Sequence, residues 1–340
     1  MKRQYYLIFM LLVATLSGCV HDYPTMTEDG EEGIDPTLVQ VNTEVTLDLE
    51  LVPLEITTET ARSGTTKAAS DYRRRFIIEA RREGKAEARQ VTVLDEAEPG
   101  NDKLTLPVNL RLHAVEYTLV VWTDYVKAGT DADLYYNTEN MENIACTEPY
   151  TGSTDRRDCL YGTAALDLRP YRDEWNARVQ VQIDMVRPLA KYEIVATDVK
   201  EFLEKTGKQR EQGETYTVTF TYGFYFPLAF NALTGKPADS QMGVTFTTPL
   251  DLPTDGSEEC TLGTDYIFVN GAESYVPLNI EIKDADGKTV SLTTGLDVPY
   301  RRGHLTTVRG PFLTSRFNPG VGIDPSFDDE DIDIDLDELK

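Results

Sequence analysis

Apolar and polar residues alternate with a repeat of two over several stretches of the chain. In residues 39–51, Val and Leu take nearly every second position, and Gln, Asn, Glu, Thr and Asp lie between them. Successive side chains of a β-strand point to opposite faces, so this pattern predicts strands with one buried face and one solvated face. The same alternation recurs at residues 104–113, 178–185, 216–222 and 278–283.

Local signals place some of these strands within a sheet. Residues 117–125 are apolar on both faces, which predicts a central strand that is covered on both sides. Pro107 cannot donate a backbone hydrogen bond, so its strand belongs at an edge or carries a bulge. The Asp286-Gly287 pair between two apolar runs predicts a hairpin turn.

Helical signals are few. Asp198 can cap a short helix over residues 199–205 that Gly207 ends, and residues 168–176 can hold one further turn. Many short, half-buried strands with so little helix predict an all-β fold of two tandem antiparallel β-sandwiches.

The amino-terminal residues have the pattern of an export signal. Two basic residues precede an apolar run at residues 5–15, which is too short for a membrane-spanning helix of about 20 residues. The run leads into Leu16-Ser17-Gly18-Cys19, which matches the bacterial lipobox. We therefore expect residues 1–18 to be a cleaved signal peptide and Cys19 to carry lipid, including acyl chains such as palmitate. The alternative is an ordinary signal peptide in which this cysteine occurs by chance.

The mature chain divides into a tether and two larger parts. Residues 19–36 form a lipidated acidic tether, because a segment so polar does not pack and its charges keep it extended. The remainder is longer than one hydrophobic core usually serves, so two domains are expected. We place the seam near Arg187, which gives an N-terminal sandwich over residues 37–186 and a C-terminal sandwich over residues 187–340.

The chain is strongly acidic. It has 58 acidic and 33 basic residues and a formal net charge of −25 at pH 7. Such a charge repels nucleic acid and anionic lipid surfaces, so we expect no nucleic-acid partner. Attachment to a membrane would then depend on the lipid at Cys19 and not on a basic patch.

Three cysteines follow Cys19, namely Cys146, Cys159 and Cys260. An odd number excludes a complete disulfide framework. Cys146 and Cys159 could pair across a loop in an oxidising compartment, or both could stay reduced. The sequence has no Cys-x-x-Cys and no cluster of histidines, so we assign neither a zinc site nor a cofactor.

The sequence lacks the familiar motifs of catalysis. It has no phosphate-binding glycine loop, no nucleophile elbow and no His-Glu-x-x-His. Its histidines, His21, His113 and His304, are far apart along the chain. We therefore expect no catalytic residue and no enzyme activity.

Eighteen tyrosines leave a different class of function open. Exposed aromatic rings can form platforms for carbohydrate, so one alternative is that the chain is a surface glycan-binding lipoprotein. Many of the tyrosines, among them Tyr216, Tyr222 and Tyr266, lie in alternating runs. Packing in the core is the simpler explanation for these.

Residues 60–75 combine small residues with separated basic ones. Arg62 lies among Thr, Ala, Ser and Gly, and Arg73, Arg74 and Arg75 follow it. A segment of this kind is a good protease substrate, which makes Arg62 the candidate processing site. The alternative is a solvated loop without such a role.

Residues 328–339 combine an acidic face with an apolar one. Ile332, Ile334 and Leu336 alternate with aspartates, which predicts a strand. This strand could be donated to the edge of a sheet in another molecule, or it could be an internal edge strand that its charges protect from aggregation. The carboxylates could also collect calcium, but they lack the EF-hand spacing, so we assign no metal site.

Four short stretches carry a resemblance to a known family. They are Tyr117-Thr-Leu-Val-Val-Trp-Thr-Asp-Tyr125, Tyr150-Thr-Gly-Ser-Thr-Asp155 leading to Tyr161-Gly162, Arg187-Pro-Leu-Ala-Lys-Tyr-Glu-Ile-Val195 and Gly303-His-Leu-Thr-Thr-Val-Arg-Gly310. In this order they resemble the fimbrial subunit lipoproteins of Bacteroides-like bacteria, the fimbrillin and minor-fimbrium-anchor group. With the lipobox they span nearly the whole mature chain.

The resemblance implies two transthyretin-like β-sandwiches, a lipid anchor in the outer membrane and assembly into surface-exposed fimbriae for adhesion. Other fimbrial subunits and a host or bacterial surface receptor would be the partners. In stalk and tip subunits of such families, an Arg-specific protease removes the lipidated first strand, and a neighbour's strand enters the vacated groove. Arg62 is the matching position here, because a cut there would remove the strand predicted at residues 39–51. Anchor members stay uncut, and the acidic ending of this chain differs from that of polymerising subunits.

Overall fold

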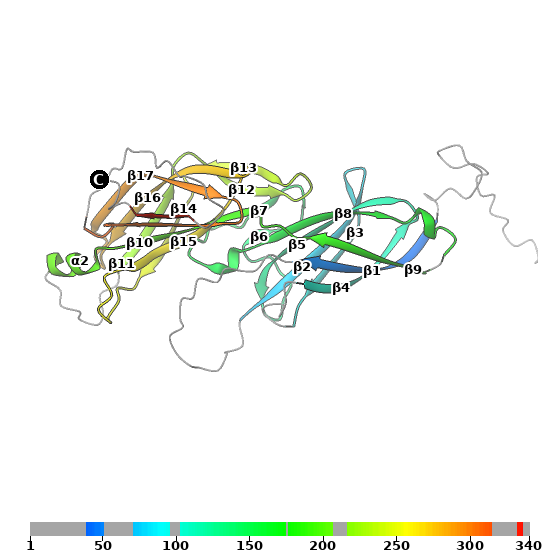
Figure 1. The fold of residues 1–340 in the computed structure, drawn as a ribbon, viewed down its shortest axis with the longest axis horizontal. Helices are drawn as coiled ribbons and strands as arrows, with labels where there is room; N and C mark the ends of the chain where they lie inside the picture. Colours follow the sequence, from blue (N-terminus) through cyan, green and yellow to red (C-terminus); the bar gives the residue numbers. More distant parts are fainter. Residues whose placement is uncertain are drawn as a thin grey trace, which may run out of the picture.

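The computed structural model describes residues 39–50, 71–95, 103–174, 176–206, 216–314 and 332–335. These residues fold into two β-rich halves that follow one another along the long axis of the molecule (Figure 1). The predicted signal peptide, Cys19, the tether and Arg62 lie outside the described residues. None of the helices in the described ranges is long and apolar enough to cross a membrane.

The first half is a sandwich of two sheets. One sheet has three strands in the order β4-β1-β9, and the other has four in the order β3-β2-β5-β8. Apolar side chains of both sheets meet in one core, among them Val45 and Leu47 of the first sheet and Leu119 and Val121 of the second. The strands are β1 (Gln40–Glu50), β2 (Tyr72–Arg82), β3 (Lys85–Val93), β4 (Lys103–His113), β5 (Glu116–Lys127), β8 (Leu160–Asp167) and β9 (Asn176–Asp184).

The second half is also a sandwich. Its sheets have the strand orders β15-β10-β18-β19 and β14-β11-β16-β17, and side chains from both sheets enter a common core. The helix α2 (Val199–Thr206) buries Val199 and Phe202 against that core. The strands are β10 (Leu189–Ala196), β11 (Tyr216–Tyr222), β14 (Thr245–Leu250), β15 (Cys260–Phe268), β16 (Glu273–Lys283), β17 (Thr289–Arg301), β18 (Leu305–Gly310) and β19 (Ile332–Asp335).

A small sheet in the order β13-β12-β7-β6 joins the two halves. Two of its strands come from the stretch of chain between β5 and β8 of the first sandwich. The other two come from the stretch between β11 and β14 of the second sandwich. A separate apolar core surrounds it, in which Trp122 of β5 meets Tyr136, Phe230 and Phe268. The strands are β6 (Tyr136–Asn137), β7 (Ile144–Cys146), β12 (Tyr225–Asn231) and β13 (Lys236–Met242).

The strands predicted from the alternating pattern are confirmed, and so is the all-β class with two sandwiches. The strand β5 lies between β2 and β8, and its two faces enter two different cores, which explains why it is apolar on both sides. Pro107 lies in β4, at the edge of its sheet. Gly287 has a φ of 78° in the predicted hairpin between β16 and β17.

Two details go beyond the sequence pattern. Most strand pairs are antiparallel, but β1 with β9, β10 with β18 and β18 with β19 are parallel. The predicted short helix is confirmed as α2, yet the carboxylate of Asp198 accepts backbone hydrogen bonds from Leu313 and Thr314. The chain passes from the first sandwich to the second between Asp184 and Leu189, close to the predicted seam, while the domain limits themselves stay a prediction.

Candidate functional site

The strand β1 occupies the middle of its sheet. It pairs antiparallel with β4 over its full length, and parallel with β9 from Asn42 onwards. On its inner face Val41, Val45, Leu47 and Leu49 are fully buried. Burial of each such side chain contributes about 1.5–3 kcal/mol, so β1 is a major part of the first core although it precedes the rest of the described fold in the chain.

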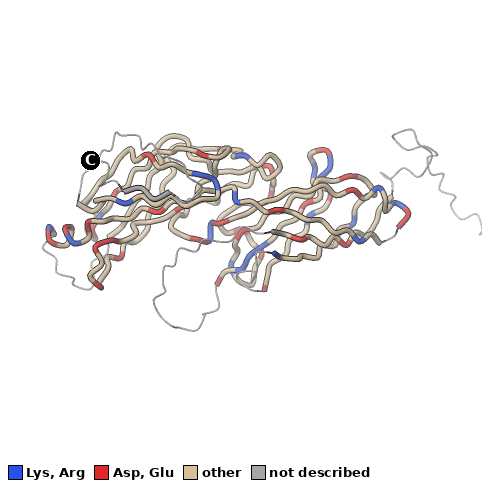
Figure 2. Tube along the Cα trace, viewed as in Figure 1, with Lys and Arg blue, Asp and Glu red and all other residues tan. Residues whose placement is uncertain are grey.

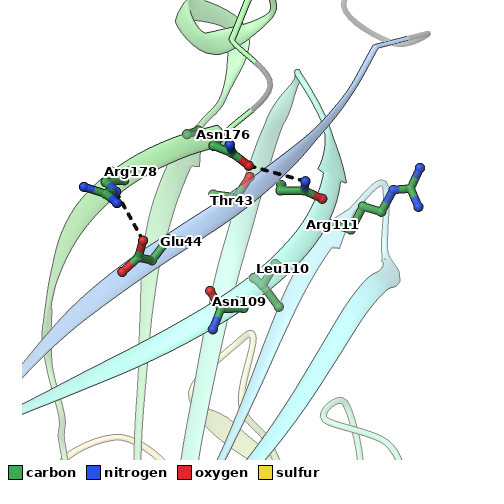
Figure 3. A pocket seen from close by; sticks show the side chains of 9 residues that line it. Thr43, Glu44, Asn109, Leu110, Arg111, Asn176 and Arg178 are labelled. Carbon is green, nitrogen blue, oxygen red and sulfur yellow. Dashed lines mark hydrogen bonds and ion pairs between the residues drawn. The ribbon is translucent and has the colours of Figure 1, made fainter.

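A polar hollow of about 370 Å³ lies on the outer face of the same three strands (Figure 3). Asn42 and Glu44 of β1 form its centre, between side chains of β4 and side chains of β9. The lining residues are Asn42, Thr43, Glu44, Asn109, Leu110, Arg111, Asn176, Ala177 and Arg178.

Cross-strand contacts order this polar hollow. The amide of Asn42 donates to Asn176 Oδ1 at 3.4 Å, and Arg178 Nε lies 3.3 Å from Glu44 Oε2 (Figure 3). The amides and guanidinium groups can hydrogen-bond a polar ligand, but the lining includes no nucleophile with an adjacent base. Because Asn42 and Glu44 come from β1, the hollow exists in this form only while β1 is in place.

Two arginines that follow Arg62 in the sequence are locked in β2. Arg75 donates from Nε and Nη2 to both carboxylate oxygens of Asp124, at 2.9 and 2.6 Å, and both side chains are buried. Burial raises the pKa of the Asp124 carboxyl, and the charge of Arg75 acts against that shift. Arg74 is also buried and donates to the hydroxyl of Tyr125 at 2.9 Å. In the folded chain these two residues are therefore poor protease sites.

A buried polar cluster connects the two halves. Arg157, between β7 and β8, donates to Asp265 of β15 at 2.9 Å, and Tyr150 and Tyr222 donate to the other oxygen of the same carboxylate. Burial raises the pKa of Asp265, whereas the Arg157 charge and the tyrosine hydrogen bonds act to lower it. The sequence pattern does not bring these residues together, although an aspartate inside the apolar run of β15 is a usable signal.

The three described cysteines are free thiols. Arg157 Nη2 donates to Cys146 Sγ at 3.2 Å. Burial raises the pKa of Cys146 to about 11 and that of Cys260 to about 12, and it raises the pKa of the fully buried Cys159 as well. Cys146 and Cys260 are partly exposed, but thiols whose raised pKa keeps them neutral are weakly reactive.

The acidic carboxyl-terminal segment adds an edge strand to the second sandwich. Ile332 and Ile334 lie in β19, which pairs with β18 in the same chain and places them opposite Thr306 and Val308. This position matches the alternative of an internal edge strand. Leu336 lies outside the described residues, and the role of the segment as a donor to another molecule stays a prediction.

The remaining candidates for chemistry do not form a site. His113 lies in β4 of the first sandwich and His304 precedes β18 of the second, while His21 lies outside the described residues. Within the described ranges, no group of three or more His, Cys, Asp or Glu could hold a metal ion. Tyr216, Tyr222 and Tyr266 are buried, which confirms their predicted place in the core.

The fold therefore defines a tandem β-sandwich protein whose first strand is an inserted central strand. The model of the family described as "Family of unknown function (DUF6562)" matches residues 36–339, and the chain belongs to that family. A search of curated proteins finds no match.

The chain is similar to several solved structures of bacterial fimbrial and cell adhesion proteins. The fimbrial anchor protein Mfa2 from Porphyromonas gingivalis is 11% identical, with 74% of this chain and 82% of that chain covered and a TM-score of 0.35. A fimbrial assembly protein from Parabacteroides distasonis is 13% identical, with 79% and 91% covered and a TM-score of 0.37. A proposed cell adhesion protein from Bacteroides eggerthii is 14% identical, with 85% and 94% covered and a TM-score of 0.40. Similarity at this level says nothing about what this chain binds.

Proposed function

We propose that this protein is a structural and adhesive subunit of a surface fimbrium, or the anchor of such a fibre, exported as a lipoprotein. The lipobox at Cys19 supports export and attachment to the outer membrane. The tandem sandwiches and the ordered sequence stretches support a place among fimbrial proteins. Other fimbrial subunits are then its partners.

The position of β1 is the observation that carries the proposal. The chain leads from Cys19 through β1 to Arg62, so one cut after Arg62 would separate both the lipid and β1 from the remaining protein. Loss of β1 would expose the unpaired edges of β4 and β9 and the apolar side chains that now pack on Leu47 and its neighbours. Such a gap accepts an extended strand, because main-chain hydrogen bonds give affinity and alternate side chains fill the core.

The two roles within a fibre differ only in this cut. A chain that keeps β1 also keeps its lipid, and it serves as the anchor at the base of the fibre. A chain that loses β1 is released from its lipid and takes the strand of a neighbour. The polar hollow changes with this exchange, because the incoming strand replaces Asn42 and Glu44 at its centre.

Mass spectrometry of fibres sheared from cells tests the proposal. We expect this protein in the sheared fibre fraction or at the fibre base in the membrane fraction. A new amino terminus at Ser63 would identify a processed subunit, and only lipidated chains that begin at Cys19 would identify an anchor. An Arg62→Ala variant should abolish a Ser63 terminus. The buried Arg75 should provide no alternative cleavage site in that variant. Absence of the protein from both fractions would refute the proposal.

A further inference from the structure

The most exposed large apolar side chains of the described residues gather at one corner of the second half. Phe224 is 70% exposed, Tyr225 66%, Met242 56% and Tyr275 53%. We call these four residues the aromatic corner. Most other aromatic side chains of this half, such as Tyr222 and Phe226 beside them, are buried in its core. A contiguous apolar patch on an otherwise polar surface marks a binding surface.

The backbone holds the aromatic corner together. Gly223 donates its N–H to the carbonyl of Pro277 at 2.7 Å, which brings the turn after β11 against β16 two residues from Tyr275. Tyr225 pairs directly with Met242 across β12 and β13. The four residues therefore come from one turn and two sheets whose backbones meet at this corner.

Phe224 is displayed at a conformational cost. Its φ is 56°, in the left-handed region that bulky residues rarely adopt, and such backbone strain costs about 1–3 kcal/mol. Burial of the ring would offset that cost, but the ring points to solvent instead. Residues held in a strained backbone cluster at functional sites such as ligand clamps.

The rim of the aromatic corner is polar and charged, with Arg301 of β17 directly opposite Glu273 of β16. The hydroxyl of Tyr275 donates to Glu273 Oε1 at 2.5 Å, and Asp297 lies opposite Pro277 in β17. Thr221 and Thr245 place their hydroxyl oxygens 3.3 Å apart nearby on the same sheet. Flat rings pack against the C–H faces of sugar rings, and carboxylates and hydroxyls at their edge accept hydrogen bonds from sugar hydroxyls.

We propose that the aromatic corner binds a short stretch of neutral glycan. Four half-exposed side chains offer roughly 500 Å² of surface, less than the roughly 800 Å² per partner of a stable protein interface. That area suits a few sugar rings better than a second copy of the chain. The rim carries two carboxylates, Glu273 and Asp297, against the one guanidinium of Arg301, and acidic residues lie along both halves of the molecule (Figure 2). The resulting negative charge disfavours uronic and other acidic sugars.

The inference supplies a ligand class for the adhesive role and rests on the proposed function only for that biological setting. Binding is a property of the folded chain, so it is measured on purified protein without fibres. Failure to bind glycan would leave the fibre role intact, and absence from fibres would leave glycan binding intact.

The test uses the full mature chain in detergent on an array of neutral hexose and hexosamine oligosaccharides, with oligogalacturonate as the acidic control. Calorimetry then measures the dissociation constant of the strongest neutral ligand. We expect binding that weakens at least tenfold in Phe224→Gly, which keeps the turn, and further in Phe224→Gly/Tyr275→Thr. Leu292→Thr, which removes an exposed apolar side chain elsewhere on the same sheet, should bind like the wild type.

Three results would overturn the inference. The first is no neutral ligand on the array for a chain that circular dichroism shows to be folded. The second is equal binding by wild type and by folded Phe224→Gly. The third is a change of sedimentation, without a change of glycan binding, on substitution of the aromatic corner, because that would identify a protein interface.

Discussion

The guanidinium of Arg157 lies 2.9 Å from the carboxylate of Asp265, and both side chains are almost completely buried. Arg157 belongs to the segment that leaves the first sandwich after β5, whereas Asp265 lies in β15 of the second. This ion pair and the apolar core around Trp122 therefore connect the two halves. In the proposed fibre, load would pass along the long axis of the molecule, and this junction would resist separation of the two halves.

Loss of this ion pair should destabilise the protein strongly. Arg157→Met leaves the Asp265 carboxylate buried without its cation, which costs about 3–5 kcal/mol. Urea denaturation followed by circular dichroism measures the change. Lys205→Met, which breaks the exposed pair with Glu201, is the control and should cost under about 0.5 kcal/mol. Equal stability of the two variants would show that the junction contributes little.

A glycine in the same segment should not tolerate a side chain. A Cβ at Gly152 would lie 2.6 Å from the ring of Phe246, so Gly152→Ala must displace a packed aromatic residue. Overpacking of this kind costs about 1–3 kcal/mol. At Gly223 the nearest atom would be 3.4 Å away, and Gly223→Ala should be nearly neutral. Thermal unfolding of both variants checks the difference, and a reversed order would contradict the packing described here.

The central strand should depend on its inner face. Leu47→Ala removes a fully buried side chain from β1 and should cost about 2–5 kcal/mol in unfolding free energy. Glu44→Gln on the outer face weakens only the exposed pair with Arg178 and should cost under about 1 kcal/mol. A small effect of Leu47→Ala would mean that β1 is not an integral part of the first core.

The three internal thiols should react slowly in the native protein. The pKa of Cys146, raised to about 11 from an ordinary value of 9.0, lowers its thiolate fraction at pH 8 about a hundredfold. Iodoacetamide labelling followed by peptide mass spectrometry should therefore show little reaction at Cys146, Cys159 and Cys260 until the chain is unfolded. Rapid labelling would contradict the raised pKa values of these thiols. A Cys146–Cys159 disulfide in protein from cells would replace the free thiols described here.

Local patterns in the sequence predicted the strands well. The alternation around Val45 and the doubly apolar run around Val121 report burial directly, because successive side chains of a strand face opposite ways. The hairpin at Gly287 followed from turn chemistry alone. These features depend on residues that are neighbours in the chain, so a single sequence contains the necessary information.

Relationships between distant segments were not predictable in this way. Nothing near β1 indicates that it pairs parallel with β9, and nothing near Ile144 indicates that it pairs with Phe230 across the two halves. Nothing in the sequence around Phe224 indicates the positive φ that accompanies its exposure. Arg74 and Arg75 looked like protease sites because their ion-pair partners lie about 50 residues or more away.

Imaging of cells with and without this protein tests the central claim most directly. A deletion strain, the same strain with the gene restored and the wild type would be compared by negative-stain electron microscopy and in an adhesion assay. We predict that deletion removes or alters the surface fibres and lowers adhesion, and that the restored gene reverses both effects. Unchanged fibres together with unchanged adhesion would contradict the fimbrial role.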